Sequence, residues 1–197
     1  MRYEKAVRRL RTIADSCQRA VAYPGQEPVL VAAYTFGPIF DGPDEVDVVR
    51  VAFALDLPAE EVPWGTTPPV SVGLVALLGL DKAPALRCWR SARRPVADSM
   101  VDRPLRIWSL DGPDSAALDA LARRDAEHLR LLPLTDDEQR QRLAEDLAIS
   151  LRHLRQVRDR YADRDWRSDH RGHGVYPENH LWDAVDGYLE LLDLGQQ

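Results

Sequence analysis

The hydrophobic and polar positions between residues 45 and 57 alternate in the manner of a long β-strand. Val51 and Phe53 share one face with the carboxylates Glu45 and Asp47, and the middle of the opposite face is also apolar. A strand that is apolar on both faces is typically covered on both sides. We therefore expect residues 45–57 to run through the interior of a sheet.

Two further patterns precede this strand. A single apolar stripe recurs every three or four residues over 2–22 and predicts an amphipathic helix, which the following Pro-Gly pair would end. A second apolar run, over 29–36, predicts a strand that leads into Gly37. The connection to the 45–57 strand is too short for a parallel crossover, so the two strands should be antiparallel neighbours.

The pattern changes after residue 57. Residues 59–64 can form one helical turn, and the apolar stretch 71–80 fits either a strand or a helix; its flanking residues favour a buried helix. Alternating runs at 86–91 and 105–110 predict two more strands, with a polar loop between them. The sheet region should end near residue 110.

The remainder of the chain predicts helices. A weak stripe covers 113–130, and a Thr-x-x-Glu capping box opens the longest helix, 135–161. The segment 163–176 is rich in charges and glycines and predicts a polar loop. A last helix should occupy 177–194, beginning at a proline.

The predicted fold class is therefore α+β. It comprises a small, mainly antiparallel sheet with an N-terminal helix, followed by a three-helix C-terminal region. We expect residues 1–110 to form the sheet region and 111–197 the helical region, with both packed on the same core.

The composition excludes some classes of protein. The chain has 197 residues, of which 45% are hydrophobic and 29% charged, as in ordinary soluble domains. No apolar run approaches the roughly 20 residues that cross a bilayer, and the N-terminus lacks the apolar segment of a secretory signal. We therefore expect a soluble, cytoplasmic protein with no membrane partner. Arginine greatly outnumbers lysine, as in GC-rich bacterial genomes, and Cys17 and Cys88 are expected to be buried free thiols.

One constellation indicates chemistry. The stretch FGPIFDGPDEVDVV places a glycine turn after one strand and two same-face carboxylates on the next. Over residues 1–57 this order resembles the minimal nucleotidyltransferases. The resemblance implies that Gly37 cradles nucleotide phosphates with backbone N–H groups. It also implies that Glu45 and Asp47 are the catalytic carboxylates and hold Mg²⁺.

The sequence departs from that pattern at several points. Pro38 stands where the family has serine or glycine, and proline offers no N–H to a phosphate. The first carboxylate is Glu45 rather than aspartate, and it follows Gly37 closely. We therefore expect a non-catalytic binding or regulatory module on a degenerate nucleotidyltransferase-like scaffold, with no cofactor. The alternatives are an active Mg²⁺-dependent nucleotidyltransferase and a purely structural interaction protein.

The polar segment near residue 170 carries a second candidate. Its possible metal ligands are His170, His173 and His180, with Asp169, Glu178 and Asp183 nearby. Their spacing matches no zinc motif, and an exposed loop is the favoured interpretation. Arg164-Asp165 followed by His170 also resembles the signature of HEPN-type helical domains, some of which cleave RNA. That signature normally opens a helix, whereas here it is expected to follow one.

A basic and aromatic region is the last candidate. It contains Arg87, Trp89, Arg90, Arg93, Arg94, Arg103, Arg106 and Trp108. Stacking combined with cationic contacts would suit a nucleotide or a single-stranded nucleic acid. The favoured alternative is a basic pair of strands that lies against acidic helices of the same molecule. The expected partner is then another protein.

Overall fold

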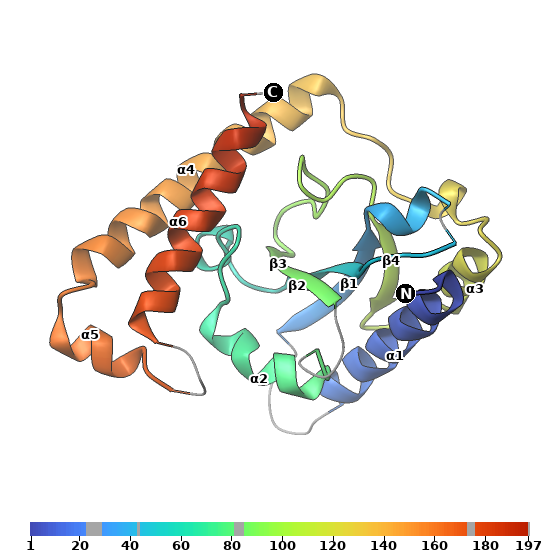
Figure 1. Cartoon of the computed structure of the whole chain (residues 1–197), viewed down its shortest axis with the longest axis horizontal. Helices are drawn as coiled ribbons and strands as arrows, with labels where there is room; N and C mark the ends of the chain where they lie inside the picture. The colour runs from blue at the N-terminus through green and yellow to red at the C-terminus, as the bar shows by residue number, and fades with distance from the viewer. Residues whose placement is uncertain (23–28, 43, 81–84, 173–175, 197) are drawn as a thin grey trace.

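The structure, a computed structural model, describes residues 1–22, 29–42, 44–80, 85–172 and 176–196. Its centre is a five-stranded sheet with the strand order β3-β2-β1-β4-β5 (Figure 1). The strands are β1 (Leu30–Phe36), β2 (Val49–Leu55), β3 (Ala85–Ser91), β4 (Leu105–Ser109) and β5 (Gly112–Pro113). Only the β2–β3 pair is parallel among the described strands. The prediction of a mainly antiparallel sheet in an α+β fold is confirmed.

The strand predicted at 45–57 is shorter than expected. β2 begins at Val49 because the preceding residues pair with the start of the chain instead: Val46 N–H donates to the Met1 carbonyl at 2.7 Å, and Tyr3 N–H donates to the Asp44 carbonyl at 2.9 Å. From Val49 onward the prediction holds, since β2 lies between β1 and β3 and six of its seven residues are buried.

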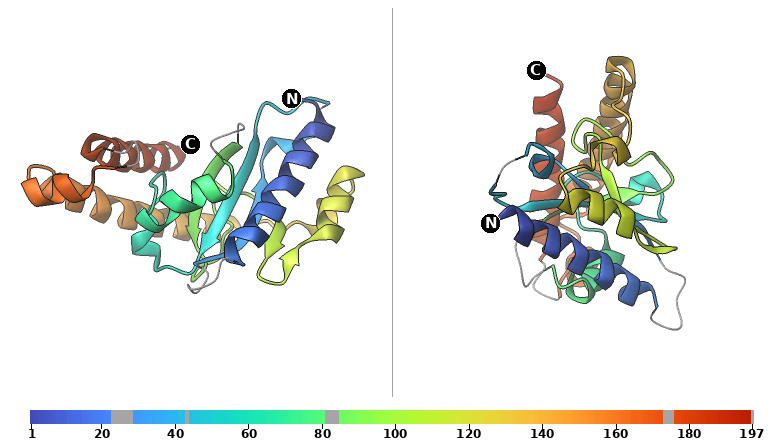
Figure 2. Two further views of the ribbon diagram at one scale, coloured as in Figure 1. Left: turned by 90° about the horizontal axis from the view of Figure 1, so that it is seen from below. Right: turned by 90° about the vertical axis from the view of Figure 1, so that its right-hand side faces the viewer.

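Helix α1 (Tyr3–Val21) packs across one face of the sheet, as predicted from its single apolar stripe (Figure 2). Its buried side chains join those of β2 and of α3 (Ser115–Ala122) in the main core, where Phe53 and Ile13 are fully buried. A smaller cluster that includes Phe36, Ala52 and Val101 covers the opposite face. β2 is therefore enclosed on both sides. A charged substitution at one of its buried positions should lower the free energy of unfolding by several kcal/mol.

Three predicted segments form shorter elements than expected. The stretch expected to be a buried helix forms α2 (Pro69–Leu77), but one side of this helix is open, with Val70 and Leu77 about half exposed. The expected turn near residue 60 is a 3-10 turn, η2 (Ala59–Glu61). The helix predicted over 113–130 is divided into α3 and a 3-10 turn, η3 (Glu127–Leu129).

The C-terminal helices α4 (Asp136–Arg160), α5 (Arg164–Asp169) and α6 (Pro177–Leu194) project from the sheet, and we call them the arm (Figure 1). The predicted capping box is present: Thr135 accepts from the Glu138 N–H, and Glu138 accepts from the Thr135 N–H. α4 and α6 form a hairpin with its own apolar cluster, which includes Val157, Trp166 and Ala184. α3 by contrast belongs to the main core.

The prediction of a loop over 163–176 is wrong for residues 164–169, which form α5. Asp163 caps this helix by accepting hydrogen bonds from the N–H groups of Asp165 and Trp166, and the buried Trp166 anchors it between α4 and α6. Arg164 therefore begins a helix, which is the position that the HEPN-type signature normally has. The C-terminal region accordingly has one helix more than predicted.

A buried ionic network holds the arm against the sheet. Arg90 of β3 pairs with Asp98 and, at 3.0 Å, with Asp146 of α4; all three side chains are less than 10% exposed. Burial alone would lower the pKa of Arg90, but the two carboxylates together raise it. Arg94 adds a 2.8 Å bond to Asp146. In the described parts of the chain, no helix is long and apolar enough to span a bilayer.

Candidate functional site

The predicted glycine turn is present, although its role stays a prediction. Gly37 follows β1 with φ 75° and ψ −145°, a conformation that favours glycine, and leads into the 3-10 turn η1 (Pro38–Phe40). A Cβ at this position would lie 3.0 Å from Cδ of Arg50. The side chain of Arg50 therefore packs against the turn.

The predicted carboxylates lie outside the sheet. Glu45 forms an isolated bridge with Arg2, and both Glu45 and Asp47 are exposed before β2 begins. Across the residues that the structure describes, no group of three or more histidine, cysteine or acidic side chains is placed to hold a metal ion. A Mg²⁺-binding role for Glu45 and Asp47 therefore stays a prediction without a third ligand beside it.

The basic and aromatic region faces largely inward. The indoles of Trp89 and Trp108 are buried in the main core, so neither can stack on a nucleic-acid base. Five of the region's six arginines form ion pairs with carboxylates, in the pairs Arg90–Asp98, Arg90–Asp146, Arg93–Asp56, Arg94–Glu145, Arg94–Asp146, Arg103–Glu127 and Arg106–Asp114. Among these carboxylates, Glu145 and Asp146 belong to the helix α4, so the expected alternative, in which basic strands lie against acidic helices, is met where Arg90 of β3 contacts α4. The sixth arginine, Arg87, is exposed and lies on a groove.

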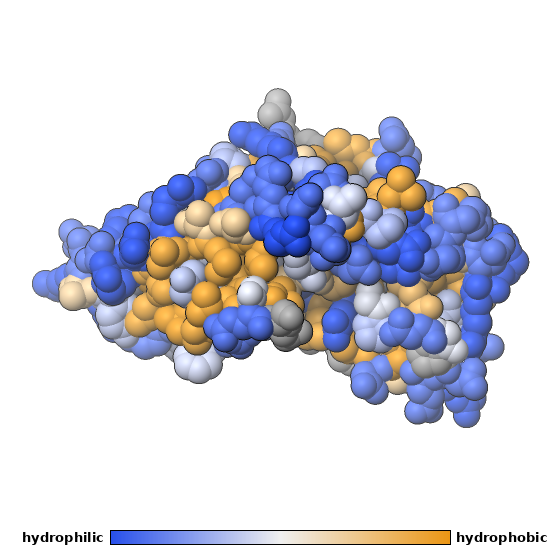
Figure 3. All heavy atoms as spheres, turned by 90° about the horizontal axis from the view of Figure 1, so that it is seen from above, coloured by the Kyte–Doolittle hydropathy of each residue, from blue (hydrophilic) through white to orange (hydrophobic). Residues whose placement is uncertain are grey.

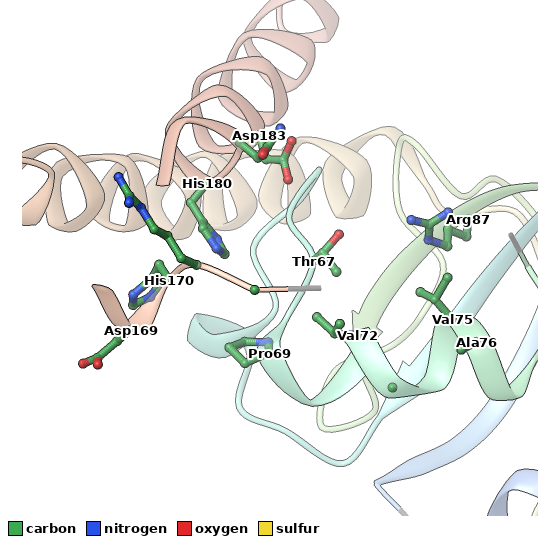
Figure 4. A pocket seen from close by; sticks show the side chains of 14 residues that line it. Thr67, Pro69, Val72, Val75, Ala76, Arg87, Asp169, His170, His180 and Asp183 are labelled. Carbon is green, nitrogen blue, oxygen red and sulfur yellow. The ribbon is translucent and has the colours of Figure 1, made fainter. Parts of the chain in front are cut away.

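That groove is a large concave surface. It has a volume of about 910 Å³ and lies between α2 on one side and α5 and α6 on the other, with β3 at one end (Figure 4). Val72, Val75 and Ala76 of α2 give it an apolar wall. His180 and Asp183 of α6 face that wall across the groove.

Two histidines and a tryptophan form a stacked unit beside the groove. The ring of His170 lies on that of Trp166, with centroids 4.1 Å apart and planes inclined by 23°. The ring of His180 meets His170 edge-on at 4.9 Å. His170 Nδ1 lies 2.8 Å from the Trp166 carbonyl oxygen, so a hydrogen bond here has Nδ1 as the donor.

The electrostatics of the groove are unusual for surface groups. Burial, and secondarily the nearby His170, lowers the pKa of His180 below its ordinary value. Burial, and secondarily Asp186, raises the pKa of Asp183, while Arg87 partly offsets this effect. His153, which lines an adjoining cavity of about 190 Å³, has its pKa lowered by burial and by His180. Perturbed titrating groups gathered in a cleft favour a functional role.

A close backbone contact sets the position of α6 relative to the groove. A Cβ at Gly187 would lie 2.2 Å from the carbonyl oxygen of Trp64 and 3.1 Å from Cα of Gly65. Only glycine at position 187 allows α6 to approach the 58–68 segment this closely. Trp64 also donates from its indole N–H to Glu190 at 2.6 Å. These contacts hold the histidines of the arm opposite α2.

The structure thus assembles part of the predicted histidine site and adds to it. His170, His180, Asp169 and Asp183 all line the groove, whereas Glu178 is bonded to Arg167 at 2.6 Å, and His173 lies outside the described residues. Sequence reasoning did not connect these residues with α2. The groove-lining residues Val72, Val75 and Ala76 belong to a run that was expected to be wholly buried, so no sequence pattern indicated that they would face a groove.

The whole chain, residues 1–197, matches the family described as Domain of unknown function (DUF7711), and the protein therefore belongs to that family. Comparisons with curated proteins and with solved structures gave no match. Family membership assigns no role to any residue here, so the roles proposed below rest on the geometry and charge of the groove.

Proposed function

We propose that this member of the DUF7711 family is a non-catalytic binding module, and that its ligand is a small organic molecule held in the groove between α2 and the arm. The observation that carries the proposal is the groove itself. Its volume of about 910 Å³ lies within the range of roughly 300–1,000 Å³ that is typical of small-molecule sites. It also combines an apolar wall with a few convergent polar groups, which is how such sites fix a ligand's orientation.

The charge of the groove selects the class of ligand. Arg87 and Arg171 are balanced by Asp169 and Asp183, and the depressed pKa of His180 keeps its imidazole neutral near pH 7. A nucleoside triphosphate would bring several negative charges to a site with no excess of cations. A neutral or zwitterionic molecule would satisfy the polar groups without leaving buried charge unpaired.

The scaffold of the module is the nucleotidyltransferase-like one that the sequence resembles. The order of helix, strand, glycine turn and strand supports this part of the proposal. Loss of catalysis is supported by Pro38, which has no N–H, and by the exposed positions of Glu45 and Asp47. A soluble protein in the bacterial cytoplasm remains the setting that we propose from the sequence.

A ligand in the groove would contact the sheet region and the arm at once. Val72 belongs to α2 and His180 to the arm, so a molecule that touches both would stabilise their relative placement. At a concentration of 100 times its Kd, such a ligand stabilises the folded protein by about 2.7 kcal/mol. For a chain of this length, that corresponds to a rise in Tm of roughly 5–10 °C.

The experiment is a thermal-shift screen that contains amino acids, nucleosides and other neutral or zwitterionic metabolites, with Mg²⁺ and the four ribonucleoside triphosphates included. We expect a neutral or zwitterionic compound to raise Tm. The shift should disappear in His180→Ala and Val72→Asp and persist in His128→Ala, whose side chain is 62% exposed and does not line the groove.

Two other results of the screen would contradict the proposal. A shift that survives both groove variants would place the ligand elsewhere. A shift produced only by triphosphates with Mg²⁺, and lost in Asp47→Ala, would favour the enzyme alternative. In that case the protein should also transfer a nucleotide to itself or to a partner.

A further inference from the structure

The outer side of the arm carries an unusually apolar surface. Trp182 and Leu189 of α6 have 67% and 47% of their surface exposed, and Val185 and Leu192 on the same helix are only half-buried. Their spacing of three, four and three residues places them on one face of the helix. We call these four residues the outer stripe. Apolar side chains gather over the arm when the molecule is seen from above (Figure 3).

Helix α4 extends this surface alongside the outer stripe. Its Leu151 is half-buried, and Ala144 and Ala148 are exposed small residues on the neighbouring side. Small residues permit another helix to approach closely. A single exposed leucine requires no explanation, but a contiguous apolar surface that includes an exposed tryptophan marks an interaction site.

The charges around this surface are segregated between the two helices. α6 contains no arginine or lysine, and its acidic residues are Glu178, Asp183, Asp186, Glu190 and Asp193. The second half of α4 is basic, with Arg152, Arg155, Arg158 and Arg160 against a single acid, Asp159. The first half of α6, which is acidic, therefore lies beside the basic second half of α4 in the hairpin.

We propose that a second copy of this chain covers the outer stripe. If two hairpins meet face to face about a two-fold axis parallel to their helices, each α6 lies on the α4 of the partner. Asp186 then lies opposite the basic second half of the partner's α4 in both halves of the interface, and the result is an antiparallel four-helix bundle. Placing α6 on α6 instead would oppose acidic residues to one another.

The register of the hairpin identifies one ion pair across this interface. Tyr161 lies beside Glu178 at one end, with 3.3 Å between the hydroxyl and a carboxylate oxygen, and Leu143 lies beside Gly195 at the other. A two-fold axis along the helices preserves this register, which brings Asp186 within one helical turn of the partner subunit's Arg155. Within one chain, neither residue has an ion pair among the described residues.

Sedimentation equilibrium across a concentration series tests the proposal directly. We expect the wild-type protein to approach twice the chain mass of 22.3 kDa. Trp182→Asp should shift it to the monomer without loss of helical circular dichroism, because this side chain is already mostly exposed. The matched control is Leu132→Asp, which changes the most exposed leucine, at 84%, outside the arm. This control should remain dimeric.

A charge exchange supplies the second measurement. Asp186→Arg and Arg155→Asp should each raise the dimer dissociation constant by about tenfold or more. The double variant should regain most of the lost dimer affinity, because it restores the ion pair with its signs reversed. The proposal is overturned if the wild-type protein is monomeric throughout the series, if Leu132→Asp dissociates it as effectively as Trp182→Asp, or if the double variant is as weak as the single ones together.

Discussion

Replacement of Asp146 by alanine should destabilise the protein strongly, because this carboxylate is the point at which α4 is held to β3. It accepts hydrogen bonds from Arg90 at 3.0 Å and from Arg94 at 2.8 Å, and only 8% of its side chain is exposed. Removing one partner of a buried ion pair costs about 3–5 kcal/mol, since the other charge remains desolvated.

The structure places the expected effect at the lower end of that range. Asp98 still lies beside Arg90 in the Asp146→Ala variant, so the guanidinium keeps one carboxylate. We expect a loss of about 3 kcal/mol in the free energy of unfolding. For a chain of this length that corresponds to a fall in Tm of roughly 6–12 °C.

The assay is urea unfolding followed by linear extrapolation, with Glu145→Ala as the matched control. Glu145 is the adjacent residue and also pairs with Arg94, at 2.6 Å, but its side chain is 46% exposed. An exposed pair of this kind contributes about 0.2–1 kcal/mol. If Asp146→Ala costs no more than Glu145→Ala, the buried network does not hold the arm to the sheet.

Three further predictions follow from particular contacts. Gly187→Ala should displace α6 and lower Tm, because the new Cβ would overlap the backbone of the facing loop at 2.2 Å; Gly73→Ala, where a Cβ would meet open space, is the control. Burial lowers the pKa of His153 in the folded protein, so the unfolded chain binds more protons than the folded one at acid pH. The free energy of unfolding should therefore fall as the pH drops below about 6.5, and it should fall less steeply in His153→Gln. Cys17 is fully buried, and burial raises the pKa of its thiol to about 12. This thiol should therefore react with a disulfide reagent only after urea unfolding, whereas the half-buried Cys88 is replaced by serine in this assay; rapid reaction of Cys17 in the native protein would contradict its placement.

Much of the fold could be predicted because most elements carry their own periodic signal. α1, α4 and β1 were each recognisable from one apolar face or run. α5 was missed because it has only six residues, and a single buried side chain, Trp166, anchors it. The parallel pairing of β3 with β2 could not be predicted, since it depends on contacts between segments that are distant in sequence.

The candidate site was predictable only in part for the same reason. His170, His180 and Asp183 attracted attention as a polar group near one another in the chain. Their alignment with α2 depends on contacts between residues far apart in the sequence, such as the approach of Gly187 to the 58–68 segment. No local sequence pattern indicates such an approach, so the apolar wall of the groove could not be predicted.

The ligand site that we propose is the groove between α2 and the arm. The most direct measurement is a nuclear magnetic resonance titration of histidine-labelled protein with the best compound from the thermal-shift screen. Ring resonances of His170 and His180 should move in a saturable manner, while that of His128, which does not line the groove, should stay in place. Equal movement of all three resonances, or movement of His128 alone, would show that the compound does not bind in this groove.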